Sequence, residues 1–419
     1  NAMKSSPVSA FLGYGHDDLA VEDPDVFRVG DGVHVLDRHA GGFYTTVATL
    51  VRREGDLWYV NRPHPHDYLP ASGGMVYTLF PVVSAYDVRD AAVESLQIDG
   101  NRAENPVPLN GCRGGGVFAL RCDRLQVLNL TIRAMHTEGI SFQTCHQPEV
   151  GYCLIEDCSG NGLHPGSGSV GFHIHHCTAR RNGACGLFYC LRVQHSLLED
   201  CLFEDNGDHG LSTGARDTDS LNRRLTIRRN GGSGIFFRDD AAADAAHRTV
   251  IADCIIADNC RAPHAEAEVH IQGATDGVRL HTTRITRVAG TPGLLLGPRL
   301  TDFQQDGVTI TPGGDGAVVD QNPPPQLSGV TAAIATYDRD AHGNHIVEGC
   351  EVSALGKTGA GELNYVSDVD VLYLAEPALA ADGTPRCEPA LAVTIATRLV
   401  GVLSRICSDN TTAGTMIWG

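Results

Sequence analysis

The sequence lacks the features that would tie the chain to a membrane or to nucleic acid. It has no run of about 18 apolar residues, so no segment is expected to cross a bilayer as a helix. It also has little positive charge, because 32 Lys and Arg stand against 50 Asp and Glu, which gives a formal charge of -18. This excess excludes binding to nucleic acid through neutralised phosphates and disfavours an anionic membrane surface. The same charge also fits a protein that is simply soluble.

The 14 cysteines include no C-x-x-C pair, so a structural zinc site is not expected. Most of them lie within apolar strand patterns, as in Tyr152-Cys153-Leu154 and Asp200-Cys201-Leu202. A buried free cysteine behaves as a small hydrophobic residue. We therefore expect most of the cysteines from Cys112 to Cys260 to be reduced and packed in a core.

A repeat of 23 or 24 residues runs through the middle of the chain. A glycine followed by an apolar residue marks it, at Gly116, Gly139, Gly162, Gly186, Gly210 and Gly234. A second series, Asn182, Asn206 and Asn230, runs in phase with the glycines. Apolar residues alternate with period two inside each repeat, as strands require, and a repeat this short cannot close its own core. Repeats that stack about 4.8 Å apart solve both problems, and asparagine suits the tight turn between strands.

The repeat therefore predicts an all-β fold, a right-handed parallel β-helix. We expect the β-helix over residues 86–350. Residues 1–85 carry no repeat and are predicted to form an N-terminal cap with a small β-rich unit, whose strands are expected at 27–29, 32–35, 45–51 and 57–60. Residues 351–419 are predicted to form a short α/β-like fragment. The first residues, Asn1-Ala2 before Met3, are typical of what a cleaved affinity tag leaves behind.

About residues 20–290 resemble uncharacterised bacterial right-handed β-helix proteins of the pectate-lyase superfamily. The resemblance is carried by the stretch from Asp99 to Asp239, and within it by Leu163-His-Pro-Gly-Ser-Gly-Ser169, Gly186-Leu-Phe-Tyr-Cys-Leu-Arg-Val193, Asp217-Thr-Asp219 and Gly234-Ile-Phe-Phe-Arg238. It implies the fold, and it implies carbohydrate-active chemistry on an anionic or neutral polysaccharide. Likeness of fold does not fix the reaction.

The tail resembles a different family. The stretch Leu355-Gly-Lys-Thr-Gly-Ala-Gly-Glu-Leu-Asn-Tyr-Val-Ser-Asp-Val-Asp-Val-Leu-Tyr373 is similar to the nucleotidyltransferase signature of glutamine-synthetase adenylyltransferases, and the match extends to about residue 415. The resemblance implies that Asp368 and Asp370 would hold Mg²⁺. That family also needs a third carboxylate on a later strand, which the sequence up to Gly419 does not supply. We expect a truncated fragment without activity.

The spacing of the repeat also places a candidate catalytic group. Residues at equal offsets from the repeat glycine stack in neighbouring coils, which puts His195 beside Asp219 and Arg192 beside Arg216. A carboxylate beside an imidazole orients it as a general acid or base, and stacked arginines suit a substrate carboxylate. We predict as catalytic His195, Asp219, Arg216 and Asp217. The alternative is that both aspartates are turn residues bonded to their own backbone.

Substrate-binding residues are expected around this group, at Arg192, His164, Tyr189, Arg238, Asp239 and Asp240. The stretch Asp208-His209-Gly210 is similar to the Gly-His-Gly of polygalacturonases, but its first residue differs and the companion Asp motifs are missing. No metal site is predicted. His173 and His175 alternate on one strand and could bind a metal side by side, but His173 takes the place of Leu197 and Leu221 in the repeat, which favours a half-buried structural histidine.

These residues favour a polysaccharide lyase that acts on a polymer containing uronic acid, because such a lyase needs a cation for the substrate carboxylate and a base for the neighbouring proton. Two alternatives stay open: a glycoside hydrolase on the same scaffold, and a non-catalytic carbohydrate-binding or surface solenoid. The expected partner is a polysaccharide, and neither nucleic acid nor membrane. The cofactor and the oligomeric state are open, although a divalent cation such as Ca²⁺ would fit. The fold class favours secretion, whereas many unpaired cysteines favour the cytoplasm.

Overall fold

The computed structural model describes residues 2–40, 44–105 and 112–321 with their side chains, and residues 330–334, 350–355 and 372–377 by their backbone. The chain divides into two units, Asn1–Asn322 and Pro323–Gly419. The helices in the described part are three short 3-10 turns: η1 (Pro24–Val26), η3 (Pro70–Ser72) and η4 (Arg102–Glu104). None of these helices has the length and apolar character needed to span a membrane.

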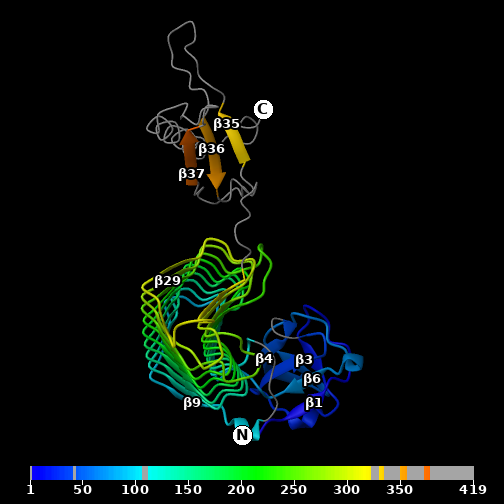
Figure 1. The fold of residues 1–419 in the computed structure, drawn as a ribbon. Coiled ribbons are helices and arrows are strands. Elements are labelled where there is room, and N and C mark those ends of the chain that lie inside the picture. The colour runs from blue at the N-terminus through cyan, green and yellow to red at the C-terminus, as the bar shows by residue number, and fades with distance from the viewer. Residues whose placement is uncertain are drawn as a thin grey trace. The chain divides into compact units, whose positions relative to one another are not determined.

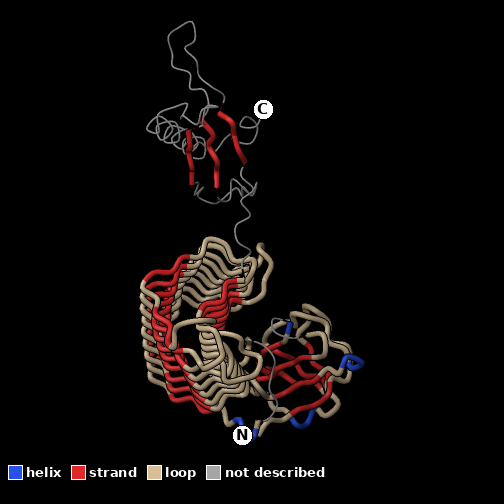
Figure 2. Tube along the Cα trace, viewed as in Figure 1, coloured by secondary structure: helices blue, strands red, loops and turns tan. Residues whose placement is uncertain are grey.

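The larger part of the first unit is a parallel β-helix, in which each coil contributes one strand to each of three long sheets (Figures 1 and 2). Sheet 1 contains β7 (Val83–Tyr86), β10 (Val117–Leu120), β13 (Ile140–Gln143), β16 (Leu163–Gly166), β19 (Leu187–Phe188), β22 (Leu211–Thr213), β25 (Ile235–Phe237), β28 (Val269–Ile271), β31 (Leu294–Leu296) and β34 (Val318–Asp320). Sheet 2 contains β8 (Ala92–Glu94), β11 (Gln126–Leu128), β14 (Glu149–Gly151), β17 (His173–His175), β20 (Leu197–Glu199), β23 (Leu221–Arg223), β26 (Val250–Ala252), β29 (Arg279–His281) and β32 (Gln304–Asp306). Sheet 3 contains β9 (Gln97–Asp99), β12 (Thr131–Arg133), β15 (Leu154–Glu156), β18 (Thr178–Arg180), β21 (Leu202–Glu204), β24 (Thr226–Arg228), β27 (Ile255–Ala257), β30 (Arg284–Thr286) and β33 (Thr309–Thr311).

The repeat glycines lie in one column, as the sequence predicts. The residue after each glycine pairs with its equivalent in the next coil, so that Leu163 lies beside Leu187 and Leu211 beside Ile235. A Cβ atom on Gly186 would lie 2.8 Å from the carbonyl oxygen of Gly210. The column therefore selects glycine because the next coil's backbone occupies the space that a side chain needs.

The asparagine series forms a buried ladder of side-chain amides. The Oδ1 atom of Asn206 accepts hydrogen bonds from the backbone N–H and the Nδ2 amide of Asn182, at 3.1 and 3.0 Å. Asn230 accepts the same pair of bonds from Asn206, at 3.0 and 2.9 Å. The ladder continues through Asn259 and ends at the carboxyl group of Glu268, which takes the place of a repeat glycine in the column.

Glu268 makes the stability of the β-helix depend on pH. Burial raises the pKa of Glu268 from 4.5 to about 7, although the hydrogen bonds from Asn259 act in the opposite direction. The protonated form is therefore favoured by folding, so its contribution is complete below pH 4.5 and is lost as pH rises through 7. We expect Glu268→Gln to gain about 3 kcal/mol of unfolding free energy relative to the parent between pH 4.5 and pH 8. Urea unfolding of both proteins across this range measures the difference, and identical pH profiles would contradict it.

Arginine–aspartate pairs hold the corners of successive coils together. In each pair the Nε and Nη2 atoms of an arginine donate to the two carboxylate oxygens of an aspartate at the equivalent corner of the preceding coil. The six pairs are Arg121–Asp87, Arg124–Asp90, Arg181–Asp157, Arg224–Asp200, Arg229–Asp205 and Arg248–Asp219. All twelve residues have positive φ, between 50° and 59°. A recurring pair of this kind belongs to the architecture rather than to one site.

The eleven described cysteines are all free, and nine of them are buried. Several pack in the apolar core between the three sheets, among them Cys145, Cys153, Cys177 and Cys201. Burial raises the pKa of the Cys158 thiol to about 12, so it stays protonated as a core residue does. The expectation of reduced, packed cysteines holds for this part of the chain.

The N-terminal part of the first unit is a six-stranded antiparallel sheet. Its order is β1 (Ser5–Pro7), β6 (Met75–Tyr77), β3 (Gly32–Leu36), β4 (Thr46–Glu54), β5 (Leu57–Val60) and β2 (Asp18–Ala20). Three of the four expected strands are present. The strand expected at 27–29 was wrong, because the carboxylate of Asp31 accepts the backbone N–H of Arg28 at 3.0 Å and closes a turn there. This sheet contacts the first coils, for example through Arg113, whose Nη1 donates to the carbonyl oxygen of Thr45 at 3.1 Å.

The described coils run from Val83 to Asp320. In the second unit, β35 (Val330–Ile334), β36 (Cys350–Leu355) and β37 (Leu372–Pro377) pair antiparallel. β35 and the start of β36 fall inside the range 86–350 that was expected to continue the β-helix, so the parallel pairing of the described strands ends earlier. Asp368 and Asp370, the Mg²⁺ ligands implied by the tail's resemblance, lie outside the described residues.

Candidate functional site

His195 and Asp219 stand at equivalent corners of neighbouring coils, and the backbone N–H of His195 donates to Thr218. The carboxylate of Asp219, however, is engaged by the guanidinium of Arg248 at 2.7 and 2.8 Å. This pair is the main cause that lowers the pKa of Asp219, and the charge of His195 contributes least. No hydrogen bond joins His195 to Asp219 in the described part of the chain. Asp219 therefore acts as one of the six corner aspartates.

Arg216 and Asp217 are also held by structural bonds. The Nε atom of Arg216 lies 3.2 Å from Asp244, which the excursion at 241–246 supplies. Asp217 is buried, and its carboxylate accepts the backbone N–H groups of Val193 and Gly214 at 3.0 Å each. Burial raises the pKa of Asp217 to about 7. Its bonds are those of a turn residue, the alternative that the sequence left open.

The predicted substrate-binding residues lie in different places, and not all of them are on the surface. Tyr189 does not line the surface, because it occupies an inward position and donates its hydroxyl to Asn222 in the core. Arg192 is exposed at a corner. Arg238, Asp239 and Asp240 lie together after β25, on the side of sheet 1 that faces away from the core.

Arg238 is tied to the outer side of sheet 1. Its guanidinium lies over the ring of Phe188, 4.6 Å from the centroid, and donates to the carbonyl oxygen of Tyr189 at 2.9 Å and to the Oγ of Ser212 at 3.1 Å. The neighbouring Asp239 pairs with Arg299. Asp240 accepts the backbone N–H of Ala215 at 2.7 Å. This corner thus brings together Arg238, Asp239 and Asp240 with Arg299, which comes from 60 residues further along the chain.

His164 points outward from β16 but is covered. Its Nδ1 lies 3.1 Å from the Glu138 carboxylate, and its ring meets Phe188 edge to face at 5.3 Å. Burial by itself lowers the pKa of His164, but Glu138 and the neighbouring Cys190 thiol outweigh burial and raise the pKa to about 10. The Glu138 carboxylate therefore favours the charged form of His164.

A more open group lies two coils further along sheet 1, and we call it the histidine patch: Asp208, His209, Phe236, His264 and His270. The Oδ1 atom of Asp208 lies 3.2 Å from Nε2 of His264 and 3.3 Å from Nε2 of His209. The ring of His209 stacks on Phe236 with 4.3 Å between centroids and 16° between planes. One carboxylate therefore stands between two imidazoles, beside a half-buried aromatic ring.

The two imidazoles next to Asp208 differ in their exposure and in their hydrogen bonds. The Nδ1 atom of His209 accepts the backbone N–H of Ser233 at 2.9 Å, so the proton of the neutral ring is on Nε2. Burial lowers the pKa of His209 to about 4, and this ring stays neutral above that pH. His264 is more than half exposed and hydrogen bonds through Nε2 to Asp208. His264 is thus free to exchange a proton with a ligand.

Two residues of this patch are not predicted from the sequence, the exposed His264 and the buried His270. His264 lies on the excursion between Asn259 and Glu268, where the repeat is interrupted and equal spacing has no predictive value. His270 follows on β28 at the position equivalent to Phe236, so its outward direction could have been read from the repeat.

A model of the right-handed β-helix region matches residues 92–196 and 115–285. A domain of unknown function (DUF4815) matches residues 302–375. Among curated proteins, the bifunctional glutamine synthetase adenylyltransferase/adenylyl-removing enzyme of Cutibacterium acnes is 46% identical over 89 residues, which are 21% of this chain and 8% of that enzyme. The enzyme of Streptomyces avermitilis is 52% identical over 67 residues, 16% of this chain and 6% of its own. The chain therefore spans less than a tenth of these relatives.

Solved structures with a similar trace include an epimerase, a lyase and a polygalacturonase. The A-module of a mannuronan C-5 epimerase from Azotobacter vinelandii has 17% identity and a TM-score of 0.39, and the match covers 58% of this chain and 80% of that one. An alginate lyase from Paenibacillus has 13% identity and a TM-score of 0.36, covering 52% and 76%. A polygalacturonase from Erwinia carotovora has 10% identity and a TM-score of 0.41, covering 57% and 72%. Likenesses at this level do not carry an activity over to the chain.

Proposed function

We propose that the chain is a polysaccharide lyase for a polymer that contains uronic acid, and that the histidine patch is its catalytic site. The observation that carries the proposal is the carboxylate of Asp208 held between His209 and the exposed His264. A carboxylate that orients an exposed imidazole is the arrangement of a general base. The proposal moves the base predicted from the repeat, at His195, to a residue whose carboxylate partner is not engaged by an arginine.

The outer side of sheet 1 carries groups that suit a sugar acid. The half-buried rings of Phe236 and Phe188 offer flat apolar surfaces along the outer side of sheet 1. Arg299 is nearly half exposed and is paired only with the exposed Asp239, so a substrate carboxylate can compete for it. An arginine fork binds a carboxylate through two parallel hydrogen bonds.

The reaction follows from these groups. The sugar carboxylate has to be neutralised, which makes the proton on the adjacent carbon more acidic, and we propose Arg299 for this role because it is a partly exposed arginine at the edge of sheet 1. Neutral His264 takes that proton, and Asp208 stabilises the imidazolium that forms. The electron pair of the broken C–H bond forms a C=C bond while the glycosidic C–O bond breaks. The imidazolium then returns the proton to the leaving oxygen, so no further reactant is needed.

Product analysis tests this reaction against its alternatives. The purified protein is incubated with polymannuronate, polyguluronate, polygalacturonate and neutral polysaccharides. We expect ultraviolet absorbance of an unsaturated uronate end to rise with at least one uronate and with no neutral polymer. New reducing ends without absorbance would identify a hydrolase, and retention on a polysaccharide column without any product would identify a binding protein. Either result would end the lyase proposal.

A further inference from the structure

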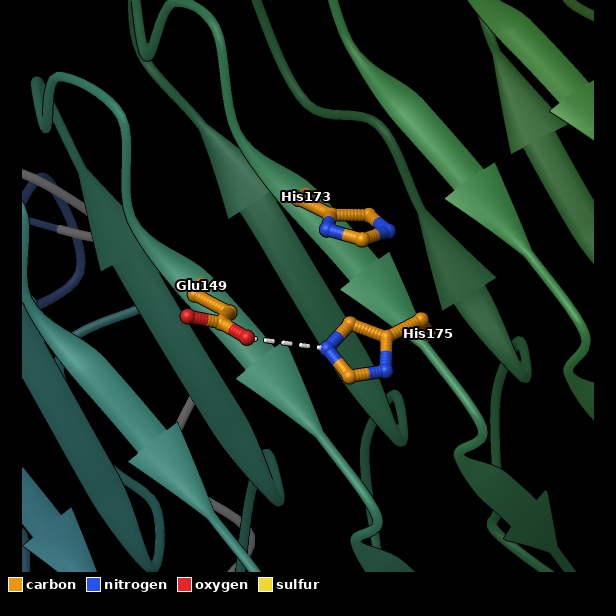
Figure 3. Close-up of side chains that lie close together, drawn as sticks. All are labelled: Glu149, His173 and His175. Atoms are coloured by element: carbon orange, nitrogen blue, oxygen red, sulfur yellow. Dashed lines mark hydrogen bonds and ion pairs between the residues drawn. The ribbon is translucent and has the colours of Figure 1, made fainter.

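A second group of polar residues lies on the outer side of sheet 2, away from the histidine patch. In the parallel register, Glu149 of β14 lies beside His173 of β17, and Gly151 lies beside His175. One donor atom from each of Glu149, His173 and His175 lies within 4.8 Å of the other two. Figure 3 shows the three side chains pointing toward one another from two neighbouring strands.

The backbone is shaped to keep the two imidazoles in this place. A Cβ atom at Gly151 would lie 2.5 Å from Cε1 of His175, so glycine is required there for the ring to lie over β14. The two rings lie 4.4 Å apart at their centroids, and Nε2 of His175 is 3.1 Å from the Glu149 carboxylate. Gln126 also donates to the Glu149 carboxylate, at 2.8 Å.

Outer hydrogen bonds fix which ring nitrogens are available. Nε2 of His173 lies 2.9 Å from Glu199, which leaves Nδ1 free, and Figure 3 shows that nitrogen on the side of Glu149. Arg223 and Arg224 bind the other carboxylate oxygen of Glu199, Oε2, which leaves Oε1 for His173. His173 is therefore oriented by a carboxylate, as metal-binding histidines usually are.

His175 is oriented from its other side. Its Nδ1 lies 3.1 Å from Nδ1 of His176, and His176 stacks on the ring of Tyr152 with 4.9 Å between centroids. When the proton sits on Nδ1 of His175 and is donated to His176, Nε2 carries the lone pair that a metal needs. The three atoms that would bind the metal are then Nδ1 of His173, Nε2 of His175 and Oε1 of Glu149.

We propose that Glu149, His173 and His175 form a binding site for a divalent transition-metal ion. Two imidazoles and one carboxylate suit Zn²⁺, Mn²⁺ or Fe²⁺ rather than Ca²⁺, which prefers oxygen ligands only. Bonds of ~2.0–2.2 Å require only a small closure of the side chains. The ligands come from one side of the ion, and the side chains of His173 and Glu149 are 38% and 33% exposed, so the remaining positions face solvent. The site is independent of the proposed lyase reaction.

Titration of the metal alone tests the site in the full-length chain. The protein is freed of metal with a chelator, desalted, and titrated calorimetrically with ZnCl₂ and, separately, with CaCl₂. We expect one zinc ion per chain with micromolar or tighter affinity, and no calcium binding at the same concentrations. Co²⁺ in place of zinc should give a visible absorption band that reports the nitrogen ligands directly. The variant His264→Ala is titrated in the same way, so that zinc bound at the histidine patch can be distinguished from zinc bound at this site.

Variants assign the zinc to these residues. His173→Ala and Glu149→Gln alter partly exposed side chains, and each should weaken zinc binding at least roughly 100-fold while the circular dichroism spectrum is unchanged. His176→Ala, which removes the outer hydrogen bond and the stack on Tyr152 but no metal ligand, should weaken binding roughly tenfold. His16→Ala, which removes an exposed histidine before β2 in the N-terminal part of the chain, serves as the control and should bind normally. Parent-like zinc affinity in both His173→Ala and Glu149→Gln, or no zinc binding by the parent protein, would overturn the proposal.

Discussion

Replacement of Asn206 by alanine is expected to lower the unfolding free energy of the β-helix by about 4 kcal/mol. Asn206 is buried, its Oδ1 accepts two hydrogen bonds from Asn182, and its Nδ2 donates to Ala179 and Asn230. The substitution leaves the backbone N–H of Asn182 without its acceptor and removes one of the two acceptors of its Nδ2 amide, in a place that water does not reach. Each buried polar group left without a partner costs about 1–3 kcal/mol, so these two losses and a small cavity give this sum.

Chemical unfolding followed by far-ultraviolet circular dichroism measures this loss. Gln304→Ala is the matched control, because it removes an exposed strand amide with only a long hydrogen bond to Asp302, and it should change the unfolding free energy by less than about 0.5 kcal/mol. A loss of less than 1 kcal/mol in Asn206→Ala would show that the ladder follows the fold without stabilising it.

The sequence predicts the fold well because stacking makes the same demand at every coil. Gly186 and Gly210 must be glycine because the next coil's carbonyl occupies the space of a side chain, and Asn206 must be an amide because its neighbours present an amide and an N–H. Such demands repeat with the period of the coil, so a single sequence displays them as a pattern.

The candidate site is less predictable because the demands on it do not repeat. Equal offsets correctly placed Asp219 next to the His195 corner, but they could not show that Arg248 of the following coil would take both carboxylate oxygens. Ala242 to Ala246 intervene between these coils, so Arg248 is 29 residues from Asp219 and not 24. A second interruption of the repeat, between Asn259 and Glu268, brings His264 back over sheet 1. The period of the repeat does not predict this position.

Residues that depart from the repeat therefore mark candidate functional sites. The corner aspartates and arginines keep one geometry through the described coils, and their charges cancel within the architecture. Asp208 departs from this rule, since its oxygens meet imidazoles and no guanidinium. Glu149 departs from it in the same way on sheet 2. Carboxylates that take no part in the corner pairs are the ones that can orient a catalytic base or bind a metal ion.

Removal of the imidazole of His264 is expected to lower lyase turnover by roughly 10²–10⁴-fold, because no other exposed base is hydrogen bonded to Asp208 in the described part of the chain. His264→Ala should leave the unfolding free energy unchanged within about 0.5 kcal/mol, since this side chain is more than half exposed. Asp208→Asn should lower turnover less, because the base remains but its imidazolium loses a charged partner.

The initial rate of absorbance increase with the best uronate polymer measures these losses, at saturating substrate so that turnover is separated from binding. His146→Ala is the control, because it removes an exposed histidine several coils away and should retain full turnover. His195→Ala decides between the two candidate bases. If it abolishes turnover while His264→Ala retains it, the catalytic base is at the corner that the repeat spacing indicated, and the histidine patch is not the catalytic site. If His264→Ala alone loses turnover, the base is the residue that the interrupted repeat carries over sheet 1, with Asp208 to hold the imidazole.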